Sequence, residues 1–200
     1  MPQRKWLITF YKGLAAWLFL SLSVWYFQAW LGKGLCLLSA FPITLMTTEI
    51  SPLVKLTQTG TDYSLELSAW VLRPIPINAD MTIPPGTELK SSTHLLHILV
   101  PVIIEWSVLL VWPVQRWTQR LLLIGTGILS AVVLVLATLP ATLLGLLEIS
   151  FQQVAVLGTE PRTVPWFLDW MVFCELGGAW LLAIIGAWLC IQLQQKLLRR

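Results

Sequence analysis

The sequence predicts a mainly α-helical polytopic membrane protein, with four transmembrane helices and a small β-hairpin-containing extracytoplasmic insert between the first and the second. Composition is the first observation behind this class: 56% of the 200 residues are hydrophobic and 12% are charged, whereas soluble domains carry about 25% charged residues. The second is that apolar residues gather in four runs, at 13–31, 92–112, 121–147 and 166–193. Each run is close to or above the roughly 20 residues that a helix needs to cross a bilayer.

The placement of tryptophan supports the same class. Many of the 12 tryptophans flank the apolar runs, and indole rings favour the headgroup level because the ring is apolar while its N–H needs a partner. We interpret them as interface anchors, with a ligand-stacking cage as the alternative.

The first segment, residues 1–46, begins with Arg4 and Lys5 and contains the first apolar run. This run is long for the hydrophobic region of a secretory signal, and no small-x-small cleavage site follows it, so we interpret it as an uncleaved span. Residues 34–46 are too few for a second span and include Pro42. They predict either an interfacial helix or an outward extension of the first helix.

Residues 47–91 change character and predict a β-rich extracytoplasmic insert. Apolar and polar residues alternate from Tyr63 to Val71, and a period of two indicates a half-buried strand. The preceding run, 53–58, ends at a turn signal, Thr59-Gly60, so the two segments predict a β-hairpin. Four prolines at 74–85 exclude a long regular element after it and predict an extended return to the membrane. A lone hairpin is marginally stable in water, so we expect it to pack on the helices or on a partner.

Residues 92–200 form a three-helix transmembrane region with a basic tail, and charge predicts its orientation. Four spans place the chain start, the link 113–120 and the tail on one side, where they hold eight of the 13 basic residues and no acidic residue. The positive-inside rule therefore puts both termini in the cytoplasm. The insert and a polar loop at 148–165 then face outward. Anionic inner-leaflet lipid accounts for the basic residues, so we predict the lipid bilayer and no nucleic acid as a partner.

Two glutamates interrupt the apolar runs. Glu105 lies in the middle of the second span, and Glu175 lies about ten residues inside the outer end of the fourth, so their depths are similar. An ionisable side chain at the bilayer centre costs a few kcal/mol. We therefore expect both carboxylates to point into the bundle, close enough to meet. The functional interpretations are a proton relay, a cation site or general acid–base catalysis; the alternative is a hydrogen bond that only fixes packing.

Small residues recur at helical spacing near these glutamates. Such residues let membrane helices approach closely. We expect five of them to line helix–helix contacts, two in the third span and three in the fourth: Gly127, Ala131, Ala179, Ala183 and Gly186.

Two histidines raise the alternative of a metal site. His94, His97, Pro101 and Glu105 follow one another at steps of three, four and four, which places them on one helix face. A spacing of three lets both histidines reach one ion, and Asp169 at the outer end of the fourth span offers a carboxylate. No HExxH-type signature accompanies them. We therefore interpret the histidines as interfacial hydrogen-bonding residues and predict no metal and no cofactor.

The order of one span, a β-rich insert with a Pro-rich return and three further spans resembles the small membrane proteins that accompany bacterial exosortases, the exosortase H-associated family. The likeness covers most of the chain and includes LATLPATLLGLLEI in the third span and ELGGAWLLAIIGAWL in the fourth. It implies an inner-membrane accessory protein beside an exosortase, which cleaves and sorts proteins with C-terminal anchors. An exosortase itself needs a Cys, an Arg and a His at an outward-facing site. Cys36, Cys174 and Cys190 are not set among such partners and show no CxxC spacing, which argues against proteolytic or transpeptidase activity here.

These observations favour a non-catalytic accessory or assembly subunit that binds a larger membrane protein. The alternative is a small transporter or membrane enzyme that uses Glu105 and Glu175, and a lipid-binding structural role comes third. No Gly-rich phosphate loop or nucleophile elbow is present in the sequence.

Overall fold

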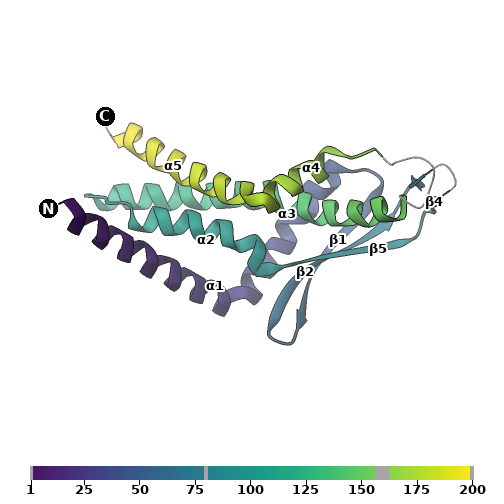
Figure 1. The fold of residues 1–200 in the computed structure, drawn as a ribbon, viewed down its shortest axis with the longest axis horizontal. Helices are drawn as coiled ribbons and strands as arrows, with labels where there is room; N and C mark the ends of the chain where they lie inside the picture. The colour runs from purple at the N-terminus through teal and green to yellow at the C-terminus, as the bar shows by residue number, and fades with distance from the viewer. Residues whose placement is uncertain (1, 79–80, 156–162, 199–200) are drawn as a thin grey trace.

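The computed structural model describes residues 2–78, 81–155 and 163–198, and it consists of a helical bundle that leads into a small β-sheet head (Figure 1). The helices are α1 (Pro2–Met46), α2 (Leu95–Val111), α3 (Trp117–Ala155), α4 (Trp166–Phe173), the π-helical turn η1 (Cys174–Gly178) and α5 (Ala179–Leu198). The strands are β1 (Ile50–Thr59), β2 (Asp62–Val71), β3 (Ile75–Pro76), β4 (Thr82–Ile83) and β5 (Glu88–His94).

Within the described residues, three helical stretches are long and apolar enough to cross a membrane: Leu7–Met46, Trp117–Ala155 and Trp166–Leu197. Helix α2 is also apolar but has only 17 residues, a length of about 26 Å. The expectation of a mainly helical membrane protein with a small antiparallel sheet after the first helix is therefore confirmed. The crossing by α2 stays a prediction.

The sheet contains the predicted hairpin and one strand that was not predicted. Strands β1 and β2 pair antiparallel, and Thr59 opposite Asp62 leaves a two-residue loop. Its first residue, Gly60, has φ +64°, a conformation that glycine adopts without steric cost. Strand β5 pairs with the other edge of β2, which gives the order β1-β2-β5. The prediction of an extended segment without regular structure is thus wrong for residues 88–94, which form a third strand of the sheet before the chain enters α2.

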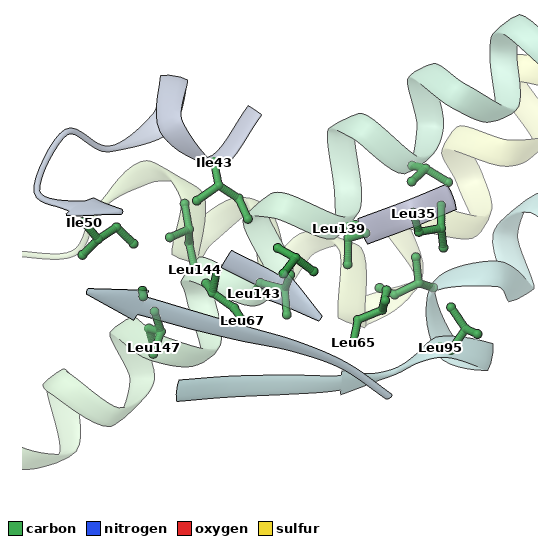
Figure 2. Close-up of a cluster of buried hydrophobic side chains, with 14 of the residues drawn as sticks. Leu35, Ile43, Ile50, Leu65, Leu67, Leu95, Leu139, Leu143, Leu144 and Leu147 are labelled. Carbon is green, nitrogen blue, oxygen red and sulfur yellow. The ribbon is translucent and has the colours of Figure 1, made fainter. Parts of the chain in front are cut away.

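The inner face of the sheet is covered by two helices that continue beyond the bundle. The second halves of α1 and α3 pack on this face, and their apolar side chains meet those of β2 between the layers (Figure 2). Leu65, Leu67 and Ala69 of β2 are all fully buried, which confirms the period-two prediction for this strand. Ser91 of β5 fixes the sheet to α3 through a hydrogen bond from its hydroxyl to the Leu143 carbonyl, at 2.8 Å.

Both long helices continue into the head. Helix α1 runs without interruption to Met46, so residues 34–46 extend the first helix, which is one of the two predicted alternatives. Helix α3 continues through Glu148 to Ala155, which corrects the loop predicted to begin at 148. Residues 156–162 of that loop lie outside the described residues. Polar residues continue the helix because this part of α3 packs in the head, beside the sheet, and the hydrophobic length rule applies only to the part that crosses lipid.

The fourth predicted span is one helical path broken by a π-helical turn. Between α4 and α5, η1 contains Gly177 with φ +105°, so the ordinary α-helical ladder is interrupted there. An inserted π turn rotates the side chains that precede it relative to those that follow.

The helix ends that are not joined to the sheet gather at the other end of the bundle. The start of α1, the α2–α3 link and the end of α5 all lie opposite the sheet (Figure 1). At the link, Arg120 Nη1 donates hydrogen bonds to the carbonyls of Leu109 and Leu110, at 3.1 and 3.2 Å. These bonds satisfy carbonyls at the C-terminal end of α2, which have no partner within the helix.

Candidate functional site

The interior of the α2, α3 and α5 bundle contains the predicted small residues. Ala179 and Ala183 of α5 are 8% and 0% exposed. Gly127 of α3 is buried, and a Cβ added there would come 2.7 Å from Leu109 Cδ1 of α2. Ala131 is half-buried on the same helix. These positions permit the close contact of the three helices.

Glu105 lies inside this contact. Its side chain is fully buried, and neither carboxylate oxygen has a hydrogen-bond partner within the described residues. Gly186 of α5 leaves the space that the carboxylate occupies, because a Cβ there would lie 3.1 Å from Glu105 Oε1 and 2.7 Å from Ser130 Oγ. Cys190 of α5 lies near the same group and near Thr126. The expected inward orientation of Glu105 is confirmed.

Glu175 does not meet Glu105. It belongs to the π-helical turn, its side chain is 42% exposed, and both of its carboxylate oxygens lie 3.1 Å from His97 Nε2. The prediction that the two carboxylates share one depth is wrong, because His97, the partner of Glu175, precedes Glu105 by eight residues, about 12 Å along α2. Gly186, which faces Glu105, likewise follows Glu175 by 11 residues.

The His97–Glu175 pair borders a small cavity where three helices are irregular. The cavity holds about 20 Å³, and its lining includes Pro101 of α2 and Thr138 and Thr142 of α3. Pro101 removes one backbone hydrogen bond from α2, and Pro140 does the same two residues beyond Thr138. Irregular backbone inside a membrane bundle is tolerated where protein surrounds it or where it lines a cavity.

The histidines and Asp169 do not come together as a metal site. His94 is the last residue of β5 and not part of the α2 face, because the helix begins at Leu95. His97 binds Glu175, and Asp169 is an exposed residue of α4. No group of three His, Cys, Asp or Glu side chains in the described ranges could hold a metal ion.

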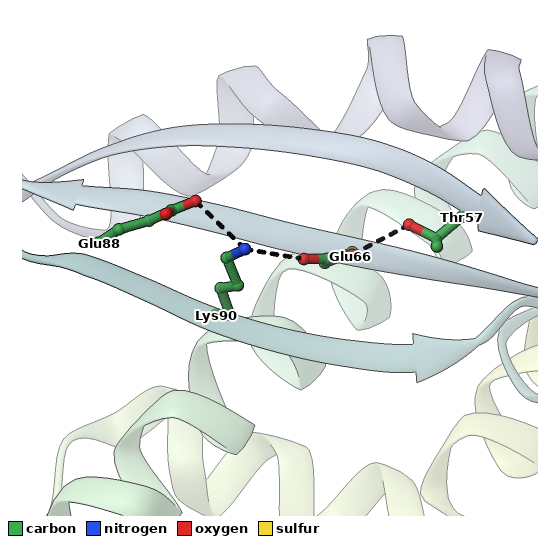
Figure 3. A network of polar contacts seen from close by, with 4 residues as sticks. All are labelled: Thr57, Glu66, Glu88 and Lys90. Atoms are coloured by element: carbon green, nitrogen blue, oxygen red, sulfur yellow. Dashed lines mark hydrogen bonds and ion pairs between the residues drawn. The ribbon is translucent and has the colours of Figure 1, made fainter.

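The outer face of the sheet is a second candidate region. Lys90 of β5 lies 3.9 Å from a carboxylate oxygen of Glu66 and 3.6 Å from one of Glu88, and the Thr57 hydroxyl donates to Glu66 at 3.0 Å (Figure 3). Exposed ion pairs of this kind contribute little to stability, about 0 to 1 kcal/mol each. They do fix the positions of the charged side chains around two exposed apolar residues, Leu53 and Trp70.

Leu53 and Trp70 form the apolar part of this face. Leu53 is opposite Ser68 and Trp70 is opposite Ser51, so the two are diagonal neighbours on the same side of the β1–β2 pair. Each is 48% exposed. The alternation of the sequence alone predicted that Trp70 lies on the outward side of its strand. The position of Lys90 beside it was not predicted, because β5 itself was not predicted.

Two larger cavities lie elsewhere. One of about 410 Å³ lies among the link from α1 to β1, the second half of α3 and the start of α4, and its lining includes Glu49 and Glu148. The second, of about 520 Å³, is an apolar groove between the first half of α1 and α2, with Gly13, Trp17, Ser107 and Trp112 in its lining. Neither cavity is lined by Glu105 or by its neighbours Ser130, Gly186 and Cys190.

Comparison of the chain with protein-family models, with curated proteins and with solved structures finds no match.

Proposed function

We propose that this protein is a non-catalytic accessory or assembly subunit of a bacterial inner-membrane complex, and that it binds a larger membrane protein through the outer face of its sheet. The exposed pair Leu53 and Trp70 carries this proposal. A tryptophan surrounded by polar contacts is typical of the few residues that supply most of the energy in protein–protein binding. Here Glu66, Glu88 and Lys90 provide that polar surround.

The way the sheet is supported favours such a role. Helices α1 and α3 contain 45 and 39 residues, and each continues from the bundle into the core beneath the sheet. At about 1.5 Å per residue they are roughly 67 and 58 Å long, which exceeds the 30 Å hydrocarbon layer. The binding face is therefore held at one height and orientation above the bilayer without a flexible joint.

The proposed topology has four crossings with both termini in the cytoplasm. Helix α2 contacts α1, α3 and α5, and it returns the chain from the sheet to the end where α1 begins (Figure 1). The eight basic residues of the chain start, the link and the tail support the cytoplasmic assignment of that end. The sheet would then face outward, where an exosortase-type protein, suggested by the resemblance in architecture, would present its own outward segment.

The test is site-specific photo-crosslinking from position 53 in intact membranes, combined with purification in mild detergent. We expect one membrane protein to be crosslinked and co-purified, and an exosortase-type protein is the first to examine. Trp70→Ala should abolish both signals and leave the unfolding temperature nearly unchanged, because this side chain is half exposed. Met81→Ala removes a side chain of the same 48% exposure outside the β1-β2-β5 sheet and should preserve both signals.

A core variant separates loss of binding from loss of folding. Leu67→Ala deletes a fully buried side chain on the opposite face of the same strand, and we expect it to lower stability by about 2–5 kcal/mol. A strictly monomeric protein whose position 53 crosslinks only to lipid would contradict the proposed function.

A small transporter or membrane enzyme is the second candidate, favoured by the fully buried and unpartnered carboxylate of Glu105. Glu105→Gln discriminates between the two. A packing role tolerates the neutral isostere, whereas proton transfer does not. Asp169→Asn, which neutralises an exposed carboxylate of α4, is the matched control.

A further inference from the structure

The groups that the structure places beside the Glu105 carboxylate cannot neutralise a negative charge. From α3 it faces Ser130, and from α5 it faces Gly186 and Cys190. The hydroxyl of Thr126, which is close to Cys190, donates to backbone carbonyls of its own helix.

Among the described side chains of the helices packed around α2, the cations are engaged or exposed. Arg120 of α3 donates to the carbonyls at the end of α2, and Lys12 and Lys33 of α1 and Lys196 of α5 are exposed. None of them forms an ion pair with Glu105 in the described part of the chain. An ionised carboxylate without a partner is strongly disfavoured in such surroundings.

The possible ligands of this carboxylate are therefore few. A divalent cation such as Ca²⁺ takes six to eight oxygen ligands, and the described surroundings offer one carboxylate and a single nearby hydroxyl, Ser130. A proton needs only the carboxylate itself.

A route for that proton leads toward the sheet. Two turns along α2, on the same face, His97 contacts Glu175, and both line the 20 Å³ cavity. A cavity needs roughly 10–15 Å³ to hold one water molecule. On the α5 side, the small residues Ala179, Ala183 and Gly186 follow one another from the cavity to Glu105.

We propose that Glu105 is an internal proton-binding site of the bundle, and that it exchanges its proton with the sheet side through the His97–Glu175 pair. This inference goes beyond the accessory role, since a proton site of this kind can set the conformation of a subunit as well as drive transport.

The test is infrared spectroscopy of the full chain in lipid nanodiscs at neutral pH. We expect a carbonyl band from a protonated carboxylic acid that is present in the wild type and in Glu175→Gln but absent in Glu105→Gln. The band should shift when H₂O is replaced by D₂O, and His97→Ala should slow this shift. A band that persists in Glu105→Gln, or a spectrum that contains only carboxylate bands, would overturn the proton site. A shift that is equally fast in His97→Ala would overturn the route.

A chemical readout covers the case in which Glu105→Gln fails to fold. Dicyclohexylcarbodiimide is an apolar reagent that modifies protonated carboxylic acids in membranes, and mass spectrometry of the wild type locates the adduct. We expect modification at position 105 that decreases as the pH is raised. Absence of the adduct together with absence of the carbonyl band counts against the proposal without any variant.

Discussion

Gly145 lets α4 approach α3 so closely that no side chain fits between them. A Cβ at this position would come 2.9 Å from Met171 Cβ, and Met171 is only 4% exposed. We expect Gly145→Ala to lower the free energy of unfolding by about 1–3 kcal/mol, the usual cost of overpacking a close contact. Equilibrium unfolding in detergent micelles measures this loss.

Gly125→Ala is the matched control in the same helix. No atom lies within 4 Å of a Cβ added there, and alanine is favoured over glycine in a helix by up to about 1 kcal/mol. Stability should therefore stay level or rise. Equal losses in both variants would show that the contact with Met171 does not account for the effect.

Single residues also mark where sequence reasoning succeeds. The position of Glu105 in an apolar run predicted its inward orientation, because hydrocarbon disfavours a carboxylate regardless of the fold. The partner of Glu175 was not predicted, because counting residues from the ends of a predicted span does not fix where the span meets its neighbour; Glu175 contacts His97, two turns along α2 from Glu105. Ser130 was missed although a hydroxyl in the apolar run of α3 was a signal that was available.

Trp170 binds α3 beside Pro140, where the helix ladder is interrupted. The proline has no N–H to donate to the Leu136 carbonyl, and the indole Nε1 of Trp170 donates to the next carbonyl, that of Ala137, at 2.8 Å. We expect Trp170→Phe to lower the free energy of unfolding by about 0.5–1.5 kcal/mol, the usual contribution of one hydrogen bond. The same unfolding experiment in micelles measures it.

Trp188→Phe is the control for Trp170→Phe. Trp188 is 56% exposed on α5, so the same change of ring removes no buried donor and should leave stability unchanged. If both variants lose equally, ring size and not the bond to Ala137 accounts for the effect.

The elements differ in how far the sequence reveals them. Strand β2 was predictable because alternate residues are buried against α1 and α3. Strand β5, ELKSSTH, has few apolar residues to alternate, and its pairing with β2 is a long-range contact that local pattern cannot report. The extension of α3 beyond Glu148 was not predicted, because the helix was assumed to end at the membrane surface and a charged residue there was interpreted as the start of a loop.

The whole molecule has two chemically different ends, and this makes its topology testable. Lys55 lies on the exposed side of β1 in the head, whereas Lys196 lies in the last turn of α5 at the opposite end (Figure 1). If the bundle crosses the membrane with both termini in the cytoplasm, Lys55→Cys should react with a membrane-impermeant maleimide in intact cells. Lys196→Cys should react only after the cells are permeabilised.

The native cysteines provide the background for this experiment. Cys174 and Cys190 are buried and Cys36 is half-buried, so the unmodified chain should react little with the reagent. The assignment rests on the basic residues at the α1 and α5 end, which the positive-inside rule places in the cytoplasm. Labelling of both introduced cysteines from the same side would mean that the head and the chain ends share a compartment. The outer face with Trp70 could not then meet an outward-facing partner while the helices span the bilayer.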